Sequence, residues 1–230
     1  MKKSIAVLGL GKYGRSLVEN LYELGADVMA VDRNEELIQD FSGSCTSAIC
    51  ANLANEEEVL SLGLKSMDIV VVAIGDDLAA SIVSITVAKE QGVPLVIAKT
   101  SSPRISSILR KVGADRILDP EGEGGARSAR ILMSSFVRDV FELDKNMSML
   151  EMVPKSEWIG ESLTELNLRS RMNLNVVAEK EKGGCWRFPD ADKPITPELL
   201  LLVVAEKKSL KKLDISSEES KGQSQDLFLY

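Results

Sequence analysis

SIAVLGLGKYG, residues 4–14, joins a short apolar run to three glycines in the spacing G-x-G-x-x-G. The run 4–8 predicts a buried strand, and the glycines follow where a helix opens. Gly9 allows a tight turn, Gly11 lets the backbone approach a pyrophosphate, and Gly14 lets the helix pack closely on the strand. The N–H groups and the positive dipole end of such a helix attract phosphates. This stretch therefore predicts a nucleotide site.

A carboxylate stands at the end of the second apolar run. Asp32 follows residues 27–31 and lies about 20 residues beyond the glycines, where a carboxylate accepts hydrogen bonds from an adenosine ribose and disfavours a 2′-phosphate. With Arg33 and Asn34 it can also cap a second helix that runs through Phe41. Together these signals predict the beginning of a β-α-β unit.

Strands continue to alternate with helices up to residue 118. We expect strands at 46–50, 69–74, 95–98 and 116–118, and a helix at 78–91. The nearly continuous β-branched run 69–74 is typical of a central parallel strand that is buried on both faces. The six alternations predict an α/β fold, a Rossmann-type doubly wound parallel sheet with helices on both faces.

Two polar residues follow predicted strands and are candidate ligand contacts. Asn52 lies at a strand-to-helix turn, where open doubly wound sheets bind their ligands, although it can also serve as a helix cap. Lys99 ends a predicted strand and faces the expected crevice. It can therefore pair with phosphates or form an ordinary surface ion pair.

The pattern changes near residues 144–146. An amphipathic helix over 124–140 is expected to connect two parts of the chain, and it can swap across or join two subunits. Short strands are expected at 148–153, 175–179, 185–188 and 199–205, with a helix near 161–166. We predict an N-terminal domain over 1–142, a small α+β domain over 143–213 and a disordered tail over 214–230, which is rich in Ser, Glu and Gln.

The composition excludes several classes of protein. The chain has 230 residues and a formal net charge of −7, which argues against a general nucleic-acid-binding protein. It contains no histidine and three cysteines without a C-x-x-C pair, so the spacing of a zinc site cannot be assembled. There is no signal-peptide pattern and no apolar run long enough to cross a bilayer. The cysteines are expected to be reduced thiols in the cytoplasm.

Catalytic patterns that accompany Rossmann sheets are missing. Without histidine, Ser-His-Asp, Cys-His and His-carboxylate relays are excluded, and Tyr13 and Tyr22 lack the lysine four positions on that short-chain reductases carry. We therefore predict a protein that is not an enzyme. Two alternatives stay open: a small NAD-dependent oxidoreductase with Lys99 or a carboxylate as base, and an NAD(H)-binding redox sensor that uses Cys45 or Cys50.

Several motifs together resemble the RCK family, the regulators of potassium conductance. They are GLGKYG at 9–14, DRN at 32–34, AIG at 73–75, GADRILDPE at 113–121 and LNLR at 166–169. The likeness runs from the first strand to about Leu213. It is strongest to the KtrA/TrkA type, the cytosolic regulatory subunits of bacterial potassium uptake systems.

The resemblance implies a nucleotide-gated ring. In that family the N-terminal domains pair and assemble, as a tetramer or octamer, beneath a potassium-translocating membrane subunit of the KtrB/TrkH type. The chain is thus expected in the cytoplasm, at the inner face of the cell membrane. ATP and ADP, or NAD(H), occupy the glycine-motif site and change the shape of the ring. The family also implies a divalent cation or Na⁺ between subunits and cyclic di-AMP at the C-terminal domain.

The resemblance also assigns roles to individual residues. The expected nucleotide contacts are Gly9, Gly11, Lys12, Tyr13, Gly14, Asp32, Arg33, Asn52, Ala73, Ile74, Gly75 and Lys99. Lys12 stands where relatives carry an arginine that reaches the γ-phosphate across the dimer. Because a lysine lacks the bidentate fork of arginine, this departure favours NAD(H). Glu121 matches a glutamate that binds the cation, and Arg169, Asn175 and Pro189 lie near the positions that line the cyclic di-AMP pocket.

Overall fold

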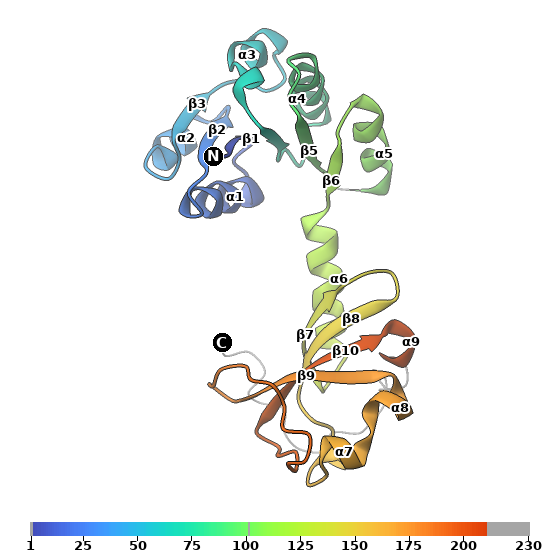
Figure 1. Cartoon of the computed structure of the whole chain (residues 1–230). Coiled ribbons are helices and arrows are strands. Elements are labelled where there is room, and N and C mark those ends of the chain that lie inside the picture. Colours follow the sequence, from blue (N-terminus) through green and yellow to red (C-terminus); the bar gives the residue numbers. More distant parts are fainter. Residues whose placement is uncertain (1, 101, 211–230) are drawn as a thin grey trace. The chain divides into compact units, whose positions relative to one another are not determined.

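Residues 2–100 and 102–210 are described by a computed structural model of the chain. They form two compact units, and the division along the chain falls between Glu123 and Gly124. The first unit is built on a parallel sheet and the second on a smaller antiparallel sheet (Figure 1). The tail expected at 214–230 lies outside the described residues. Among the described residues, no helix has the length and apolar character that a membrane crossing requires.

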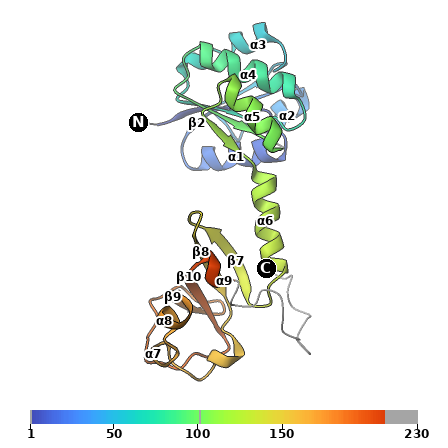
Figure 2. The ribbon, with the colours of Figure 1, turned by 90° about the vertical axis from the view of Figure 1, so that its right-hand side faces the viewer.

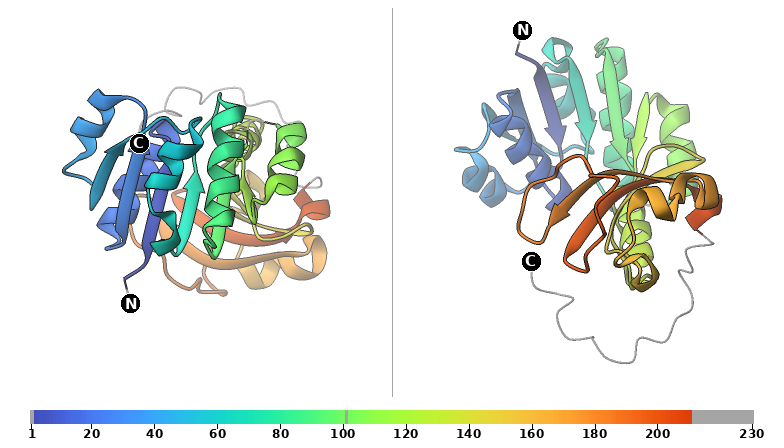
Figure 3. Two further views of the ribbon diagram at one scale, coloured as in Figure 1. Left: turned by 90° about the horizontal axis from the view of Figure 1, so that it is seen from above. Right: turned by 60° about the horizontal axis from the view of Figure 1, so that its bottom comes forward.

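The sheet of the first unit contains six parallel strands in the described part of the chain. They are β1 (Ser4–Leu8), β2 (Asp27–Asp32), β3 (Ser47–Cys50), β4 (Ile69–Val72), β5 (Leu95–Lys99) and β6 (Arg116–Leu118). Their order is β3-β2-β1-β4-β5-β6, and Figure 3 shows them side by side. This is the doubly wound order of a dinucleotide-binding fold, which reverses between β1 and β4. The predicted Rossmann-type sheet is therefore confirmed.

Helices cover both faces of this sheet. On one face lie α1 (Lys12–Glu23) and α2 (Glu35–Phe41); on the other lie α3 (Glu56–Ser61), α4 (Leu78–Glu90) and α5 (Pro103–Val112), with a 3-10 turn at Leu64–Ser66. Val7 belongs to the apolar cluster beneath α1 and α2, whereas its neighbour Leu8 belongs to the cluster beneath α3 to α5. Because both faces are covered, the strand sequences are nearly continuous apolar runs.

Short polar side chains begin most of these helices. The side chains of Asn34, Asn55, Asp77 and Ser102 accept hydrogen bonds from N–H groups in the first turns of α2, α3, α4 and α5. Each cap satisfies donors that have no partner within the helix. Helix α1 differs, because its N-cap is Gly11, which has no side chain to offer. The N–H groups at the start of α1 are therefore open to a ligand.

Asp115, just before β6, joins three elements of the first unit. Its carboxylate accepts a hydrogen bond from Val96 N on β5 at 2.7 Å and pairs with Lys89 Nζ of α4 at 3.0 Å. The bond from Val96, together with Lys89, lowers the pKa of Asp115 below its ordinary value of 3.8, although partial burial opposes this. The charged carboxylate therefore stabilises this end of the sheet.

Asp115→Asn is expected to lower the free energy of unfolding at pH 7 by about 1 kcal/mol, because the carboxylate is still partly exposed. A carboxylate whose pKa is lowered by folding stabilises the protein above its ordinary pKa, and this stabilisation is lost as the pH falls through the folded pKa. The difference from wild type should therefore shrink below about pH 4. Urea unfolding across pH measures it, with the exposed Asp40→Asn as the control. A difference that persists in full at low pH would contradict this role.

The second unit is a four-stranded antiparallel sheet in the order β7-β8-β10-β9, within the described residues. Its strands are β7 (Val137–Glu142), β8 (Met147–Met152), β9 (Leu174–Glu181) and β10 (Leu199–Glu206). A 3-10 turn (Ser156–Trp158), α7 (Leu163–Leu166) and α8 (Leu168–Met172) connect β8 to β9, and α9 (Lys207–Leu210) follows β10 (Figure 2). Alternate residues of β10 are buried, as expected for a sheet with one covered face. The predicted small α+β part is confirmed.

The helix expected over 124–140 is shorter than predicted. Helix α6 spans Pro120–Leu132, and the chain then forms β7, which pairs with β8. The Ser134 hydroxyl accepts hydrogen bonds from Phe136 N and Val137 N and turns the chain after α6. The prediction that the helix continues to Val140 is therefore wrong. Pairing with β8 outweighs the helical spacing of the apolar residues, because strand formation depends on neighbouring strands.

The strand expected over 185–188 is also wrong. Arg187 exchanges two backbone hydrogen bonds with Glu179, each 2.9 Å long, and this forms an isolated bridge rather than a strand. Trp186 and Phe188 are exposed, Phe188 by 90%. The apolar residues of this stretch suggest a strand, but their side chains are exposed and no face of the stretch is buried in a core.

Candidate functional site

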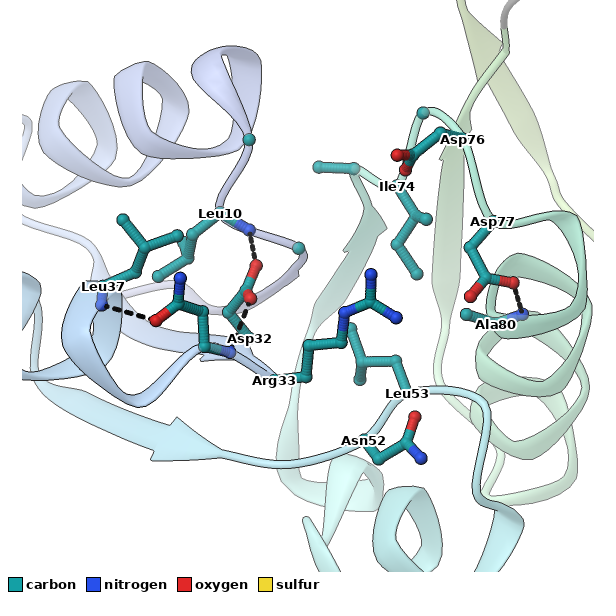
Figure 4. A pocket seen from close by; sticks show the side chains of 15 residues that line it. Leu10, Asp32, Arg33, Leu37, Asn52, Leu53, Ile74, Asp76, Asp77 and Ala80 are labelled. Atoms are coloured by element: carbon teal, nitrogen blue, oxygen red, sulfur yellow. Dashed lines mark hydrogen bonds between the residues drawn. The ribbon is translucent and has the colours of Figure 1, made fainter.

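A cavity of about 310 Å³ opens at the carboxyl ends of β1 to β4 (Figure 4). Its lining residues come from the loops after these strands and from the helix turns that follow: Gly9, Leu10, Gly11, Asp32, Arg33, Asn34, Leu37, Asn52, Leu53, Ala73, Ile74, Gly75, Asp76, Asp77 and Ala80. The cavity lies where the strand order reverses, which is the usual ligand position in open α/β sheets.

Most of the predicted nucleotide contacts line this cavity. The exceptions are Lys12, Tyr13, Gly14 and Lys99. Seven further residues line the cavity without having been predicted as contacts: Leu10, Asn34, Leu37, Leu53, Asp76, Asp77 and Ala80. Most of them are chain neighbours of predicted residues, and this adjacency is the signal that would have found them.

The glycine turn after β1 has the geometry that the motif predicts. Gly9 has a φ of +102°, which other residues rarely adopt, and its N–H donates to Val31 O at 2.7 Å. A Cβ on Gly14 would lie 1.9 Å from Gly9 O, so α1 packs directly on the turn. A Cβ on Gly11 would meet no heavy atom within 4 Å. The turn therefore has no room for a side chain at Gly14, whereas the space beside Gly11 is free and a phosphate can approach the backbone there.

Asp32 braces two loops that form one wall of the cavity. One carboxylate oxygen accepts a hydrogen bond from Leu10 N at 2.6 Å (Figure 4), and the other accepts one from Asn34 N at 2.9 Å. A carboxylate can accept about four hydrogen bonds, so these two leave capacity for ribose hydroxyls. Asp32 therefore both holds the glycine turn and presents an acceptor at the cavity.

Arg33 and Asn52 lie on the side of the cavity formed by β2 and β3. The Arg33 side chain is exposed and points into the cavity in Figure 4. Asn52 Oδ1 accepts a hydrogen bond from Ala54 N at 3.1 Å. The cap of α3 is Asn55, so the alternative role of Asn52 as the cap of that helix is wrong. Both side chains are thus placed at the cavity wall.

The opposite wall, after β4, is acidic. Asp77 Oδ1 accepts a hydrogen bond from Ala80 N at 2.9 Å and caps α4, and Asp76 is exposed beside it. The lining named above contains three carboxylates, with Asp32 on the far side, and one guanidinium, that of Arg33. A polyphosphate therefore meets attraction at the start of α1 and repulsion at the start of α4.

Lys99 and Tyr13 lie beside the cavity rather than in its lining. Lys99 Nζ is 2.6 Å from Glu121 Oε1 and 6.0 Å from the centre of the Tyr13 ring. The hydrogen bond from Lys99 lowers the pKa of the Glu121 carboxyl. Burial, and then the charges of Glu123 and Glu121, raise the pKa of the Tyr13 phenol, so this phenol is uncharged at neutral pH. The exposed Lys12 begins α1.

Within the described part of one copy of the chain, Glu121 is not in a cluster of residues that could hold a metal ion. Among the described residues there is no group of three or more His, Cys, Asp or Glu side chains that could hold a metal ion. Glu121 is paired with Lys99 instead. A second copy of the chain would have to supply the missing ligands.

The residues associated with cyclic di-AMP lie in the second unit. Arg169 is exposed on α8, Asn175 is exposed on β9, and Pro189 is partly buried in the connection between β9 and β10. A cavity of about 200 Å³ in this unit is lined by other residues, which include Arg130, Glu142 and Lys207. None of the three predicted residues lines this cavity.

The three cysteines are free thiols. Cys45 is buried, and burial raises the pKa of its thiol. Cys50 and Cys185 are exposed, and Cys50 Sγ lies 3.6 Å from Arg33 O, close to the cavity wall. Of the two cysteines in the redox-sensor alternative, Cys50 is the accessible one.

Comparison with known proteins places this chain in a family. The TrkA-N domain matches residues 5–120. The Ktr system potassium uptake protein A of Vibrio alginolyticus is 35% identical over 202 residues, which is 88% of this chain and 92% of that protein. The Ktr system potassium uptake protein A of Bacillus subtilis (strain 168) is 32% identical over 92% of this chain and 96% of that protein.

Solved structures share the fold. The GsuK RCK domain has a TM-score of 0.66 at 16% sequence identity, covering 96% of this chain and 49% of that chain. The GsuK channel bound to NAD has a TM-score of 0.65 at 15% identity, covering 96% of this chain and 40% of that chain.

Proposed function

This chain belongs to the TrkA-N domain family and to the Ktr system potassium uptake proteins within it, and we propose that it is a nucleotide-sensing regulatory subunit of a potassium uptake system. The observation that carries the proposal is the cavity at the strand reversal. The uncapped start of α1 would bind phosphates, and Asp32 would accept hydrogen bonds from a ribose.

The proposed ligand is NAD(H) or an adenine nucleotide, ATP or ADP. The GsuK channel, which has the same fold, is described as bound to NAD. Within this chain, Lys12 lies outside the cavity lining, and the wall opposite α1 carries Asp76 and Asp77. In this lining three carboxylates outnumber one guanidinium, that of Arg33, so a third phosphate would add negative charge to a cavity that is already acidic. This charge arrangement favours NAD(H) or ADP over ATP.

Regulation requires that the ligand distinguishes two states of the protein. A ligand shifts an equilibrium only as far as it binds one state more tightly than the other. In the proposed mechanism the two states belong to a homo-oligomeric ring of paired N-terminal domains, a tetramer or octamer. The ring acts on a potassium-translocating membrane subunit of the KtrB/TrkH type from the cytoplasmic face of the membrane.

Two further ligands belong to the proposal. Glu121 of two copies would share a divalent cation or Na⁺, since carboxylate oxygens suit hard cations and the described part of one chain does not supply enough of them. Arg169, Asn175 and Pro189 would contribute to a cyclic di-AMP site on the second unit.

A non-enzymatic role is supported by the relatives, which are potassium uptake proteins. The oxidoreductase alternative needs a base in the cavity. One candidate base, Lys99, is paired with Glu121 and lies outside the lining, which leaves the lining carboxylates of Asp32, Asp76 and Asp77 as the candidates for that alternative. A redox-sensing role would depend on Cys50, the accessible thiol beside the cavity.

Calorimetric titration with NADH, NAD⁺, ADP, ATP and cyclic di-AMP tests the proposal. We expect at least one of the adenine nucleotides or dinucleotides to bind with a Kd below about 100 μM, which corresponds to about −5.5 kcal/mol. Light scattering of the same samples should show a change in the size or shape of the oligomer. If none of the ligands binds below this limit, the regulatory proposal fails. Steady NADH oxidation with small carbonyl compounds would favour the enzyme instead.

A further inference from the structure

Lys99 is a cation held between two parts of the first unit. It is the last residue of β5, and its side chain is 13% exposed. Its Nζ lies 2.6 Å from Glu121 Oε1, whereas the Glu121 side chain is 65% exposed. The ammonium is thus tucked into the unit and reaches outward to its partner carboxylate.

One side of this ammonium faces the wall of the cavity. A Cβ built on Gly75, which lines the cavity, would lie 3.4 Å from Lys99 Nζ, so the ammonium rests against the backbone of this turn. The ring of Tyr13, in the first turn of α1, is 6.0 Å away, and a cation at this distance from an aromatic face is attracted to it. The ammonium is therefore close to the cavity although it is not part of the lining.

The other side of the Lys99 ammonium faces the first turn of α6. Glu121 belongs to that turn, which Asp119 caps through a hydrogen bond from Gly122 N to Asp119 Oδ1 at 2.9 Å. No residue of α6 in the described structure is buried, so packing adds little to hold this helix within a single copy. Besides the chain itself, which reaches α6 from β6 through Asp119, the ion pair to Lys99 joins the first turn of α6 to the sheet.

We propose that Lys99 is a shared cation, which binds either Glu121 or an anionic phosphate of a ligand in the cavity, so that the ligand releases the first turn of α6. The proposal rests on the nucleotide site proposed above. The carboxylate of this ion pair is 65% exposed, so solvent weakens the attraction, and a lysine side chain is a flexible point charge that can turn to a second anion. The division between the two units falls within α6, between Glu123 and Gly124. The turn that the ligand releases therefore lies directly before the second unit in the chain.

Ligand binding weakens the ion pair between Lys99 and Glu121, and the ion pair weakens ligand binding by the same factor. A double-mutant cycle at these two positions measures this coupling. Glu121→Gln frees Lys99 and should strengthen binding of the adenine nucleotide or dinucleotide about three- to tenfold. Lys99→Met should weaken it, and in the Lys99→Met background Glu121→Gln should have no effect. Affinities are measured by calorimetry in a buffer with EDTA, which keeps metal ions from competing for Glu121.

A general charge effect gives a different result. Removing any carboxylate near the cavity would strengthen anion binding, but such an effect would persist in the Lys99→Met background. Glu123→Gln is the matched control, because Glu123 lies two residues further along α6 and its charge also reaches Tyr13. We expect it to change affinity by less than about twofold. Equal effects of Glu121→Gln with and without Lys99 would overturn the proposal.

Amide hydrogen exchange provides a second measurement. The amides of Gly122 and Glu123 donate to Asp119 and report on the first turn of α6. Ligand should accelerate their exchange in wild type but not in Lys99→Met, and Lys99→Gln, which also removes the charge, serves if Lys99→Met does not fold. If a nucleotide binds but neither the cycle nor the exchange shows coupling, this proposal alone fails. If no nucleotide binds wild type, the proposed function fails and this inference falls with it.

Discussion

Gly14→Ala is expected to destabilise the first unit by about 3 kcal/mol or more and to lower its Tm by roughly 10 °C. The new Cβ would lie 1.9 Å from Gly9 O, and the atom in its way is a backbone atom that cannot rotate aside. Either α1 must move off the sheet or the glycine turn must open. Thermal unfolding followed by circular dichroism measures the loss, and ligand binding should disappear with it.

Gly11→Ala is the matched control, since it adds the same methyl group to the same turn. Gly11 has a φ of −61°, which any residue adopts, and its Cβ would meet no heavy atom within 4 Å. The variant should fold with a Tm within about 2 °C of wild type. Its methyl group would occupy the approach to the start of α1, so nucleotide affinity should fall at least about tenfold. Unchanged affinity would show that the phosphates do not bind at this turn.

Asp32→Ala is expected to weaken binding of the adenine nucleotide or dinucleotide by about 100-fold, or about 3 kcal/mol. The substitution removes the proposed ribose acceptor and also leaves the N–H groups of Leu10 and Asn34 without this partner, so the glycine turn loses its brace. Calorimetric titration of the variant measures the affinity. Asp32→Asn, which keeps an acceptor of the same shape, should fall between Ala and wild type.

Asp76→Asn is the control that distinguishes the role of Asp32 as a ligand contact from an effect of the overall charge of the cavity. Asp76 lines the same cavity and is exposed. Removing its charge should leave the affinity for an anionic ligand unchanged or raise it, which is opposite in sign to the effect of Asp32→Ala. If Asp32→Ala binds as tightly as wild type, Asp32 is not a ligand contact.

Local sequence was sufficient to predict the fold of the first unit and the position of its cavity. The runs that form β1, β2 and β4 are apolar on both faces, and no helical period competes with them. The glycine spacing specifies its own backbone geometry, because Gly9 needs a positive φ and Gly14 has no room for a side chain. The position of the cavity follows from these strands and their order. Most residues that line it could therefore be predicted from the sequence.

The second unit was harder to predict for a physical reason. Residues 137–142 carry apolar side chains at spacings that fit a helix or a strand, and pairing with β8 decides between them. Residues 185–188 contain aromatic side chains that suggest a strand, but these residues stay outside the core. In both places the outcome depends on contacts that sequence periodicity does not encode.

The sequence by itself determined the Rossmann-type sheet, the glycine turn and the position of Asp32 at the end of β2, because each depends on residues close together in the chain. Only the tertiary structure decided that Asp32 braces Leu10 and Asn34, that Asp76 and Asp77 form an acidic wall, and that Lys99 pairs with Glu121. The contacts of Asp32 with Leu10 and of Lys99 with Glu121 join segments that follow different strands. Their side chains meet because parallel strands bring their carboxyl ends to one edge of the sheet, and which of them pair depends on distances that the chain acquires only when folded.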